Sequence, residues 1–244
     1  MKTILFADGD VGKAISHYLL ENYLCDLSMI VTIAENDISA LANRHEVKTC
    51  IFEGTESFAE DIDPNVELGI LAWWPKIIKP PLLEKPKLGF INTHPSLLPF
   101  NRGKHYNFWA LVEQAPFGVT LHRVDASIDT GAIVAQQKIP YDWTDDGESL
   151  YKKAQSSMID LFQSTYPKLR SGYIESIAQS HDIGSFHYSS ELELASEIKL
   201  EDAYNARDML NLLRARTFTN HPGCWFIDSG EKYEITINIK KVKL

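Results

Sequence analysis

Short apolar runs alternate with amphipathic stretches along the first part of the chain. The apolar runs cover residues 2–7, 27–32, 47–53, 66–74 and 88–94. Helix-like segments separate them at 13–23, after Asn36 and, more weakly, at 56–62. Strands that alternate with helices are typical of a parallel sheet with crossover helices. The pattern therefore predicts an α/β fold with an open, doubly wound, mostly parallel Rossmann-like sheet.

The pattern changes after residue 94. We expect a short helix at 107–113, two longer strands at 117–125 and 131–142, and a long helix at 148–170. A polar break at 180–190 precedes a helix at 201–215 and a hairpin built from residues 224–228 and 232–239. We therefore predict a large domain over 1–185 and a small C-terminal region, helix plus β-hairpin, over 186–244.

Composition and charge narrow the class of protein. Apolar residues make up 44% and charged residues 23% of the 244, which is ordinary for a soluble globular protein. The 24 Lys+Arg against 33 Asp+Glu give a formal charge of −9, which argues against a nucleic-acid partner. Only three cysteines occur, without metal spacing, and no apolar stretch reaches 18 residues. We expect a cytoplasmic protein with no membrane partner and no metal.

A glycine turn follows the first predicted strand. Gly9 and Gly12 supply only G-x-x-G, which is weak evidence for a dinucleotide site. Asp8 and Asp10 would also repel a pyrophosphate. We interpret the segment as a strand-to-helix turn and not as a cofactor site.

The end of the predicted strand at 88–94 carries the chemistry. Asn92 and His94 are two residues apart, so an extended strand places both side chains on one face. Pro95 should end the strand, and carboxyl ends of strands are where open α/β sheets bind ligands. An amide can stabilise an oxyanion and an imidazole can move a proton. A strand-end histidine that caps a loop is the alternative interpretation of His94.

A carboxylate next to a glycine turn lies further along the chain, at Asp129 in the segment Asp129–Gly131. A carboxylate can orient an imidazole and favour its charged form. Asn92, His94 and Asp129 together would suit acyl transfer to an amine.

These residues belong to a longer pattern. Asn92–Pro99, which reads Asn-Thr-His-Pro-Ser-Leu-Leu-Pro, and the later Asp129–Gly131 resemble the hallmark of the N10-formyltetrahydrofolate-dependent formyltransferases. The order of elements agrees from residue 2 to about 170. The resemblance implies that Asn92, His94 and Asp129 are catalytic, that the peptide before Pro99 is cis, and that N10-formyltetrahydrofolate is the co-substrate.

The resemblance also places the folate. It implies one wall at the loop Trp73–Ile78 and a second wall in the loop before the catalytic aspartate. Without the family, Trp73 and Trp74 fit core packing equally well. The residues implied for the folate are Trp74, Lys76, Ile78, Val124, Asp125 and Ser127.

The acceptor amine is predicted from differences within the family. The acidic chain lacks the large basic C-terminal domain of the family's tRNA-formylating member. It is also about 60 residues longer than the member that formylates glycinamide ribonucleotide. The segments 73–78, 101–109 and 213–218 look like the sugar N-formyltransferases. The implied acceptor is a dTDP-linked amino sugar, dTDP-4-amino-4,6-dideoxyglucose as best guess, in O-antigen or other surface polysaccharide biosynthesis, with a homodimer formed through the C-terminal region.

The candidate contacts to that sugar nucleotide are Arg102, Lys104, His105, Asn107, Arg214, Phe218 and Trp225. The first three follow His94 closely enough to hold a diphosphate. Arg214 near a helix C-terminus also suits the helix dipole, and the two aromatic residues fit base stacking and core or dimer packing.

Rival functions stay open. The same three residues would serve a formyltetrahydrofolate hydrolase, or a transferase that acts on the 3-amino isomer or on another small amine. A binding sensor without activity is a further alternative. The epimer, the nucleotide base and the group that accepts the amine proton are left undecided by the sequence.

Overall fold

The computed structural model describes residues 1–54, 58, 60, 62–180 and 182–243. The chain forms two compact units whose segments alternate along the sequence. Unit 1 consists of Met1–His94, Val119–Gln137 and Gln155–Gln179, and unit 2 consists of Pro95–Gly118, Lys138–Ala154 and Ser180–Leu244. The last passage from unit 1 to unit 2 lies close to the polar break, and the domain boundary after residue 185 stays a prediction.

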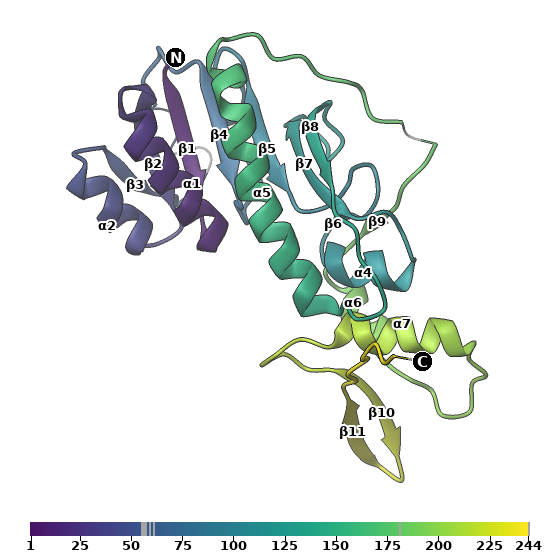
Figure 1. The fold of residues 1–244 in the computed structure, drawn as a ribbon. Coiled ribbons are helices and arrows are strands. Elements are labelled where there is room, and N and C mark those ends of the chain that lie inside the picture. The colour runs from purple at the N-terminus through teal and green to yellow at the C-terminus, as the bar shows by residue number, and fades with distance from the viewer. Residues whose placement is uncertain (55–57, 59, 61, 181, 244) are drawn as a thin grey trace. The chain divides into compact units, whose positions relative to one another are not determined.

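A seven-stranded sheet runs through unit 1 in the order β3-β2-β1-β4-β5-β7-β8 (Figure 1). Its strands are β1 Thr3–Ala7, β2 Leu27–Thr32, β3 Thr49–Ile51, β4 Leu68–Ala72, β5 Phe90–His94, β7 Gly118–Arg123 and β8 Ile133–Lys138. The first five pair in parallel, whereas β7 pairs with β5 in the antiparallel direction. The predicted mostly parallel, doubly wound sheet is confirmed.

Helices α1 Gly9–Asn22 and α2 Asp37–Arg44 connect strands of this sheet, whereas α5 Gly147–Arg170 follows β8, the last strand of the sheet in chain order. The helix predicted from residue 13 already begins at Gly9, so the glycine turn is the first turn of α1. Gly9 has a φ of +60°, and a Cβ on Gly12 would lie 3.0 Å from the carbonyl oxygen of Ala72. These glycines therefore allow α1 to start close to the sheet. The helix predicted at 56–62 falls largely outside the described residues.

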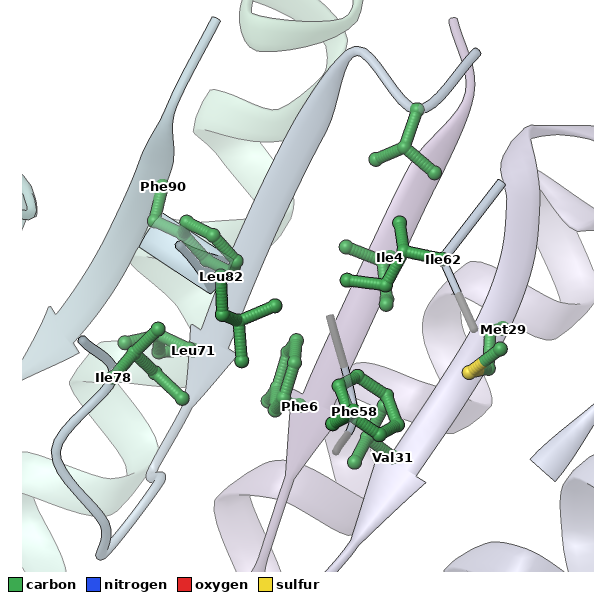
Figure 2. Packing of buried hydrophobic residues seen from close by; sticks show 11 residues of the cluster. Ile4, Phe6, Met29, Val31, Phe58, Ile62, Leu71, Ile78, Leu82 and Phe90 are labelled. Carbon is green, nitrogen blue, oxygen red and sulfur yellow. The ribbon is translucent and has the colours of Figure 1, made fainter. Parts of the chain in front are cut away.

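The core of unit 1 explains why the strands are so uniformly apolar. Buried side chains from β1, β2, β4 and β5 meet the segments around Phe58 and Leu82 (Figure 2). Phe6 lies at the centre. Its ring is in edge-to-face contact with the rings of Phe58, Trp74 and Phe90, at 5.2–5.7 Å between ring centroids. Parallel strands covered on both faces need side chains of this kind at nearly every position. Two short 3₁₀ turns complete the unit, Leu24–Asp26 and Leu82–Glu84.

Unit 2 contains shorter elements. They are β6 Arg102–Gly103, α4 Tyr106–Val112, β9 Phe186–His187, α6 Glu191–Ala195, α7 Ala206–Arg216, β10 Cys224–Asp228 and β11 Glu231–Ile235. The predicted helix at 201–215 begins later, at Ala206, because the side chain of Asn205 accepts from the backbone N–H of Arg207 and caps it. β10 and β11 form the predicted hairpin. Over the residues that the structure describes, no helix is both long and apolar enough to span a bilayer.

Candidate active site

Asn92 and His94 lie at the carboxyl end of β5, two residues apart as the period of a strand requires. Thr93 between them points to the other face, where its hydroxyl donates to the carbonyl of Leu71 at 3.1 Å. The same hydroxyl accepts from the backbone N–H of Trp73 at 2.8 Å. Thr93 thus fastens the end of β5 to the end of β4. The peptide between Leu98 and Pro99 is cis, as the resemblance implies.

His122 completes this face, and the sequence analysis did not identify it. The antiparallel register of β5 and β7 places His122 directly opposite Asn92. Its Nδ1 lies 2.8 Å from the carbonyl oxygen of Arg123, which can only accept, so Nδ1 carries the proton. Its Nε2 therefore accepts from the Asn92 amide at 3.1 Å. Spacing could not reveal this partner, because the pairing depends on the direction of β7.

Asp129 reaches the same face from the turn between β7 and β8. Its carboxylate lies 3.4 Å from Nδ1 of His94 and 3.6 Å from Nε2 of His122. The backbone of Asp129 is left-handed, with a φ of 56°, which aspartate tolerates better than most residues. A Cβ on Gly131 would overlap the carbonyl oxygen of Arg123, so only glycine fits there. The glycine of the Asp-x-Gly pattern is therefore a requirement of this turn.

Burial sets the charge of His122. Desolvation, followed by the neighbouring His94, lowers the pKa of His122 to about 4, although the carboxylate of Asp129 opposes the shift. His122 is thus neutral at neutral pH. His94 is 4% exposed, and its Nε2 is buried without a hydrogen-bond partner among the described residues. Asp129 therefore faces one ring nitrogen of His94, while the other nitrogen is left for a reacting group.

This arrangement can stabilise a tetrahedral oxyanion. One hydrogen of the Asn92 amide is used by His122, so the amide orientation is set and the second hydrogen is left to donate. An amide donor beside an oriented imidazole suits acyl transfer. The three residues predicted from the sequence are thus brought together.

The ligand atoms of His94, His122 and Asp129 also lie within 4.8 Å of one another. Two imidazoles and a carboxylate are a donor set that zinc accepts. However, Nε2 of His122 already accepts a hydrogen bond from Asn92, and a metal there would displace the amide. The hydrogen bonds account for the cluster without an ion, and the absence of a metal requirement stays a prediction.

The residues predicted for the folate lie on two loops of unit 1. Ile78 is buried in the hydrophobic cluster of Figure 2, and Trp74 and Val124 pack against that cluster. Asp125 accepts hydrogen bonds from the backbone N–H of Ser127 and from the hydroxyl of Thr130. The other two predicted residues, Lys76 and Ser127, are exposed. Both loops thus meet the same part of the core, and their role in binding stays a prediction.

The residues predicted for the sugar nucleotide all belong to unit 2. Arg102 is the first residue of the short strand β6, whose backbone pairs with β9, and Lys104 follows directly after this strand. His105 precedes α4 in a left-handed conformation, with a φ of 57°. Desolvation, then Arg216 and Lys104, lower the pKa of His105. The cationic segment is therefore held in place by β6 and by the start of α4.

The other predicted contacts have protein partners. The amide of Asn107 donates to the carbonyl of Gly147 at 2.8 Å. Arg214 is 5% exposed, and its guanidinium donates to Asn211 and to the carbonyls of Asp142 and Asp145. Phe218 contacts the rings of Tyr151 and His221, and Lys232 lies over the ring of Trp225 at 4.1 Å. These contacts give the four residues structural roles, and their ligand roles stay predictions.

Comparison with known proteins gives two matches to family models. Residues 35–164 match the model described as formyl transferase, and residues 191–241 match the N-formyltransferase dimerization C-terminal domain. The first stretch contains Asn92, His94, His122 and Asp129. The second begins close to the domain boundary predicted after residue 185.

Two curated relatives match about two thirds of the chain. A methionyl-tRNA formyltransferase of Koribacter versatilis is 33% identical over 172 residues, which cover 68% of this chain and 52% of that protein. A dTDP-4-amino-4,6-dideoxyglucose formyltransferase of Mycobacterium tuberculosis is 25% identical over 154 residues, which cover 63% of this chain and 65% of that protein. The chain spans about half the length of the first of these relatives.

Two solved structures are similar over most of the chain. A sugar N-formyltransferase from Shewanella has a TM-score of 0.83 at 22% identity, and the match covers 100% of this chain and 99% of that one. A formyltransferase from Anoxybacillus kamchatkensis in complex with UDP-4,6-dideoxy-4-formamido-L-AltNAc and tetrahydrofolate has a TM-score of 0.62 at 25% identity. That match covers 86% of this chain and 97% of the other. At 22% identity, the similarity to the Shewanella protein shows a shared fold alone.

Proposed function

Because the chain belongs to the formyl transferase family, we propose that it transfers a formyl group from N10-formyltetrahydrofolate to the amine of a nucleotide-linked amino sugar. The observation that carries this proposal is the cluster of Asn92, His94 and Asp129 at the carboxyl end of β5. Carboxyl ends of strands are where open α/β sheets hold their ligands.

The residues of the cluster take distinct roles in the proposed reaction. The neutral amine attacks the formyl carbon and a new C–N bond forms. The bond from that carbon to the folate nitrogen then breaks, the amine gives up one proton, and the leaving folate nitrogen takes one up. Asn92 donates its second amide hydrogen to the oxyanion that develops on the formyl oxygen, and Nε2 of His94 faces the reacting atoms. The carboxylate of Asp129 lies 3.4 Å from Nδ1 of His94 and orients the ring.

The folate is proposed to lie between the loops 74–78 and 124–127. Support comes from the shared core beneath Trp74, Ile78 and Val124, and from the solved relative that contains tetrahydrofolate. Backbone groups of these loops would pair with the flat pterin edge. A crystal structure with a non-reactive formyl folate tests this placement, and a folate bound at Gly9–Gly12 instead would refute it.

The acceptor is proposed to be dTDP-4-amino-4,6-dideoxyglucose, for a surface polysaccharide such as the O-antigen. Similarity in sequence does not decide the acceptor, because the chain also matches a methionyl-tRNA formyltransferase. Two features favour a sugar nucleotide: the N-formyltransferase type of C-terminal domain and the formal charge of −9, which suits tRNA poorly. Arg102 and Lys104 are the proposed partners of the diphosphate.

A homodimer and a cytoplasmic location complete the proposal. The C-terminal region exposes large apolar side chains, with Leu194 75% and Ile227 56% exposed. The match of residues 191–241 to the N-formyltransferase dimerization C-terminal domain supports a dimer formed through this region. The three cysteines are free, which suits the reducing conditions of the cytoplasm.

One assay tests the reaction and the acceptor together. The protein is incubated with N10-formyltetrahydrofolate and, separately, with dTDP-4-amino-4,6-dideoxyglucose, its 4-epimer, the 3-amino isomer, glycinamide ribonucleotide and methionyl-tRNA. Mass spectrometry then measures the formylated product. We expect the highest kcat/KM for the 4-amino glucose isomer. Preference for the 3-amino isomer would change the regiochemistry, activity on tRNA alone would refute the sugar acceptor, and formate release at the full rate without any amine would indicate a hydrolase.

A further inference from the structure

Gln179 lies beneath the turn that carries Asp129. The chain reaches it through an extended segment that pairs with β8: Ile133 and Ile177 exchange two backbone hydrogen bonds, of 2.7 and 2.8 Å. Gln179 is 6% exposed and is the last residue of unit 1. Its Nε2 donates to the carbonyl oxygen of Asp129 at 2.9 Å and to that of Gly131 at 2.7 Å.

The orientation of this amide is determined by its partners. Both are carbonyl oxygens, which only accept, so the nitrogen and both of its hydrogens must face the turn. The Oε1 atom of Gln179 is buried and has no partner among the described residues. Gln179 thus directs both of its donor hydrogens at this one turn and leaves its acceptor oxygen unpaired within the described part of the chain.

The turn needs such support because its backbone is unusual. Asp129 is left-handed, and Gly131 lies so close to Arg123 that no side chain fits. On the exposed side, the carboxylate of Asp125 holds the hydroxyl of Thr130 at 2.8 Å. On the buried side, Gln179 holds the two carbonyls that bracket Thr130. The direction of the Asp129 side chain follows from this backbone, and with it the 3.4 Å approach to His94.

We propose that Gln179 is a positioning residue for the transfer reaction, which acts by holding the Asp129–Gly131 turn so that the carboxylate faces His94. This inference rests on the proposed function. Gln179 does not touch the reacting atoms. It acts on the rate through Asp129, and we expect it to affect kcat and to leave KM for the acceptor nearly unchanged.

The first test replaces the donor without changing the shape. In Gln179→Glu a carboxylate oxygen takes the place of the amide nitrogen and faces two carbonyl oxygens. We expect kcat to fall about 100-fold, since a displacement of about 1 Å in a reacting group can cost that much, with KM within about threefold of wild type. Gln179→Asn keeps the amide on a shorter side chain and should recover part of that loss. Gln163→Glu, on α5 in the same unit, is the matched control and should keep the wild-type kcat.

The second test separates positioning from general destabilisation. Gln179→Ala and Asp129→Asn are combined, and single-turnover rates are measured for the two single variants and the double variant, together with their thermal unfolding. If Gln179 acts through Asp129, its removal should change the Asp129→Asn rate by less than about twofold, because the two losses are not additive. Losses that multiply, or a Gln179→Glu variant with wild-type kcat, would overturn the proposal. A wild-type protein that formylates none of the amines would instead refute the proposed function.

Discussion

The two sets of polar residues singled out by the sequence differ in how the fold uses their side chains. In unit 1, Asn92, His94 and Asp129 converge, and Nε2 of His94 is buried without a partner among the described residues. In unit 2, Arg214 and Asn107 direct their polar atoms at protein carbonyls. Residues that look alike in a sequence, as polar groups near a predicted site, thus separate into those that are left available and those that hold the structure.

The difference has a physical cause. An unpartnered polar atom in a buried position costs about 1–3 kcal/mol, and Nε2 of His94 would recover part of this cost when it bonds a reacting group. A buried guanidinium, by contrast, is stabilised when carbonyl oxygens accept its hydrogens. The comparison predicts that changes in the first set reduce the rate and that a change at Arg214 reduces stability.

The largest effect is expected at Asn92. Replacing it with alanine removes an oxyanion donor, which should lower kcat by about 10²–10³. Binding of both substrates should change little, because the donor acts on the charge that develops in the transition state. Steady-state kinetics measure this, with Asn43→Ala on the exposed part of α2 as control. Near-normal turnover by the Asn92→Ala variant would remove Asn92 from the catalytic set.

The second prediction concerns the pH dependence of stability. The pKa of His122 is lowered to about 4 in the folded protein, against an ordinary value of 6.5. Between pH 6.5 and 4 the unfolded chain therefore binds a proton that the folded protein does not, and the free energy of unfolding falls as the pH falls. The difference of about 2.5 pKa units corresponds to roughly 3 kcal/mol.

The measurement is urea unfolding from pH 7 to pH 4 for wild type, His122→Gln and the control His45→Gln. We expect the His122→Gln variant to lose less stability over this range than the other two proteins. Parallel curves for all three would show that His122 is not a neutral, buried member of the cluster.

The sequence predicted the site in part because its information is local. Strand period places Asn92 and His94 together, and Gly131 marks the turn beside Asp129. The contributions of His122 and Gln179 depend on strand direction and on a bridge to β8, which join residues far apart in the chain. No spacing rule covers such pairs.

The fold was predictable for a similar reason. The predictions that were wrong concern the ends of helices. Alternating apolar runs specify the parallel strands, whereas the start of α1 depends on how closely Gly12 approaches Ala72. The start of α7 depends on which residue caps it, and Asn205 does so. In both cases the deciding contact is made by one residue and leaves the hydrophobic pattern unchanged.

The third prediction tests the structural role of Arg214. Replacement with alanine leaves the carbonyls of Asp142 and Asp145 without this donor, and should lower the free energy of unfolding by about 2 kcal/mol. Chemical denaturation measures the loss. The control Arg207→Ala, on the exposed side of the same helix, should cost less than about 1 kcal/mol. A rise in KM for the sugar nucleotide without loss of stability would instead place Arg214 in the binding site.

The smallest effect is expected at Lys104, whose side chain is exposed beside β6. If it holds the diphosphate, Lys104→Ala should raise KM for the sugar nucleotide about 5–10-fold and leave kcat unchanged, because the contact is equally strong in the ground and transition states. The effect should shrink as salt is raised, since exposed charges are screened. Lys48→Ala, an exposed lysine of unit 1, is the matched control. A fall in kcat with constant KM would move Lys104 from the binding set to the set that acts on the transition state, and the contrast between the two units would then no longer hold.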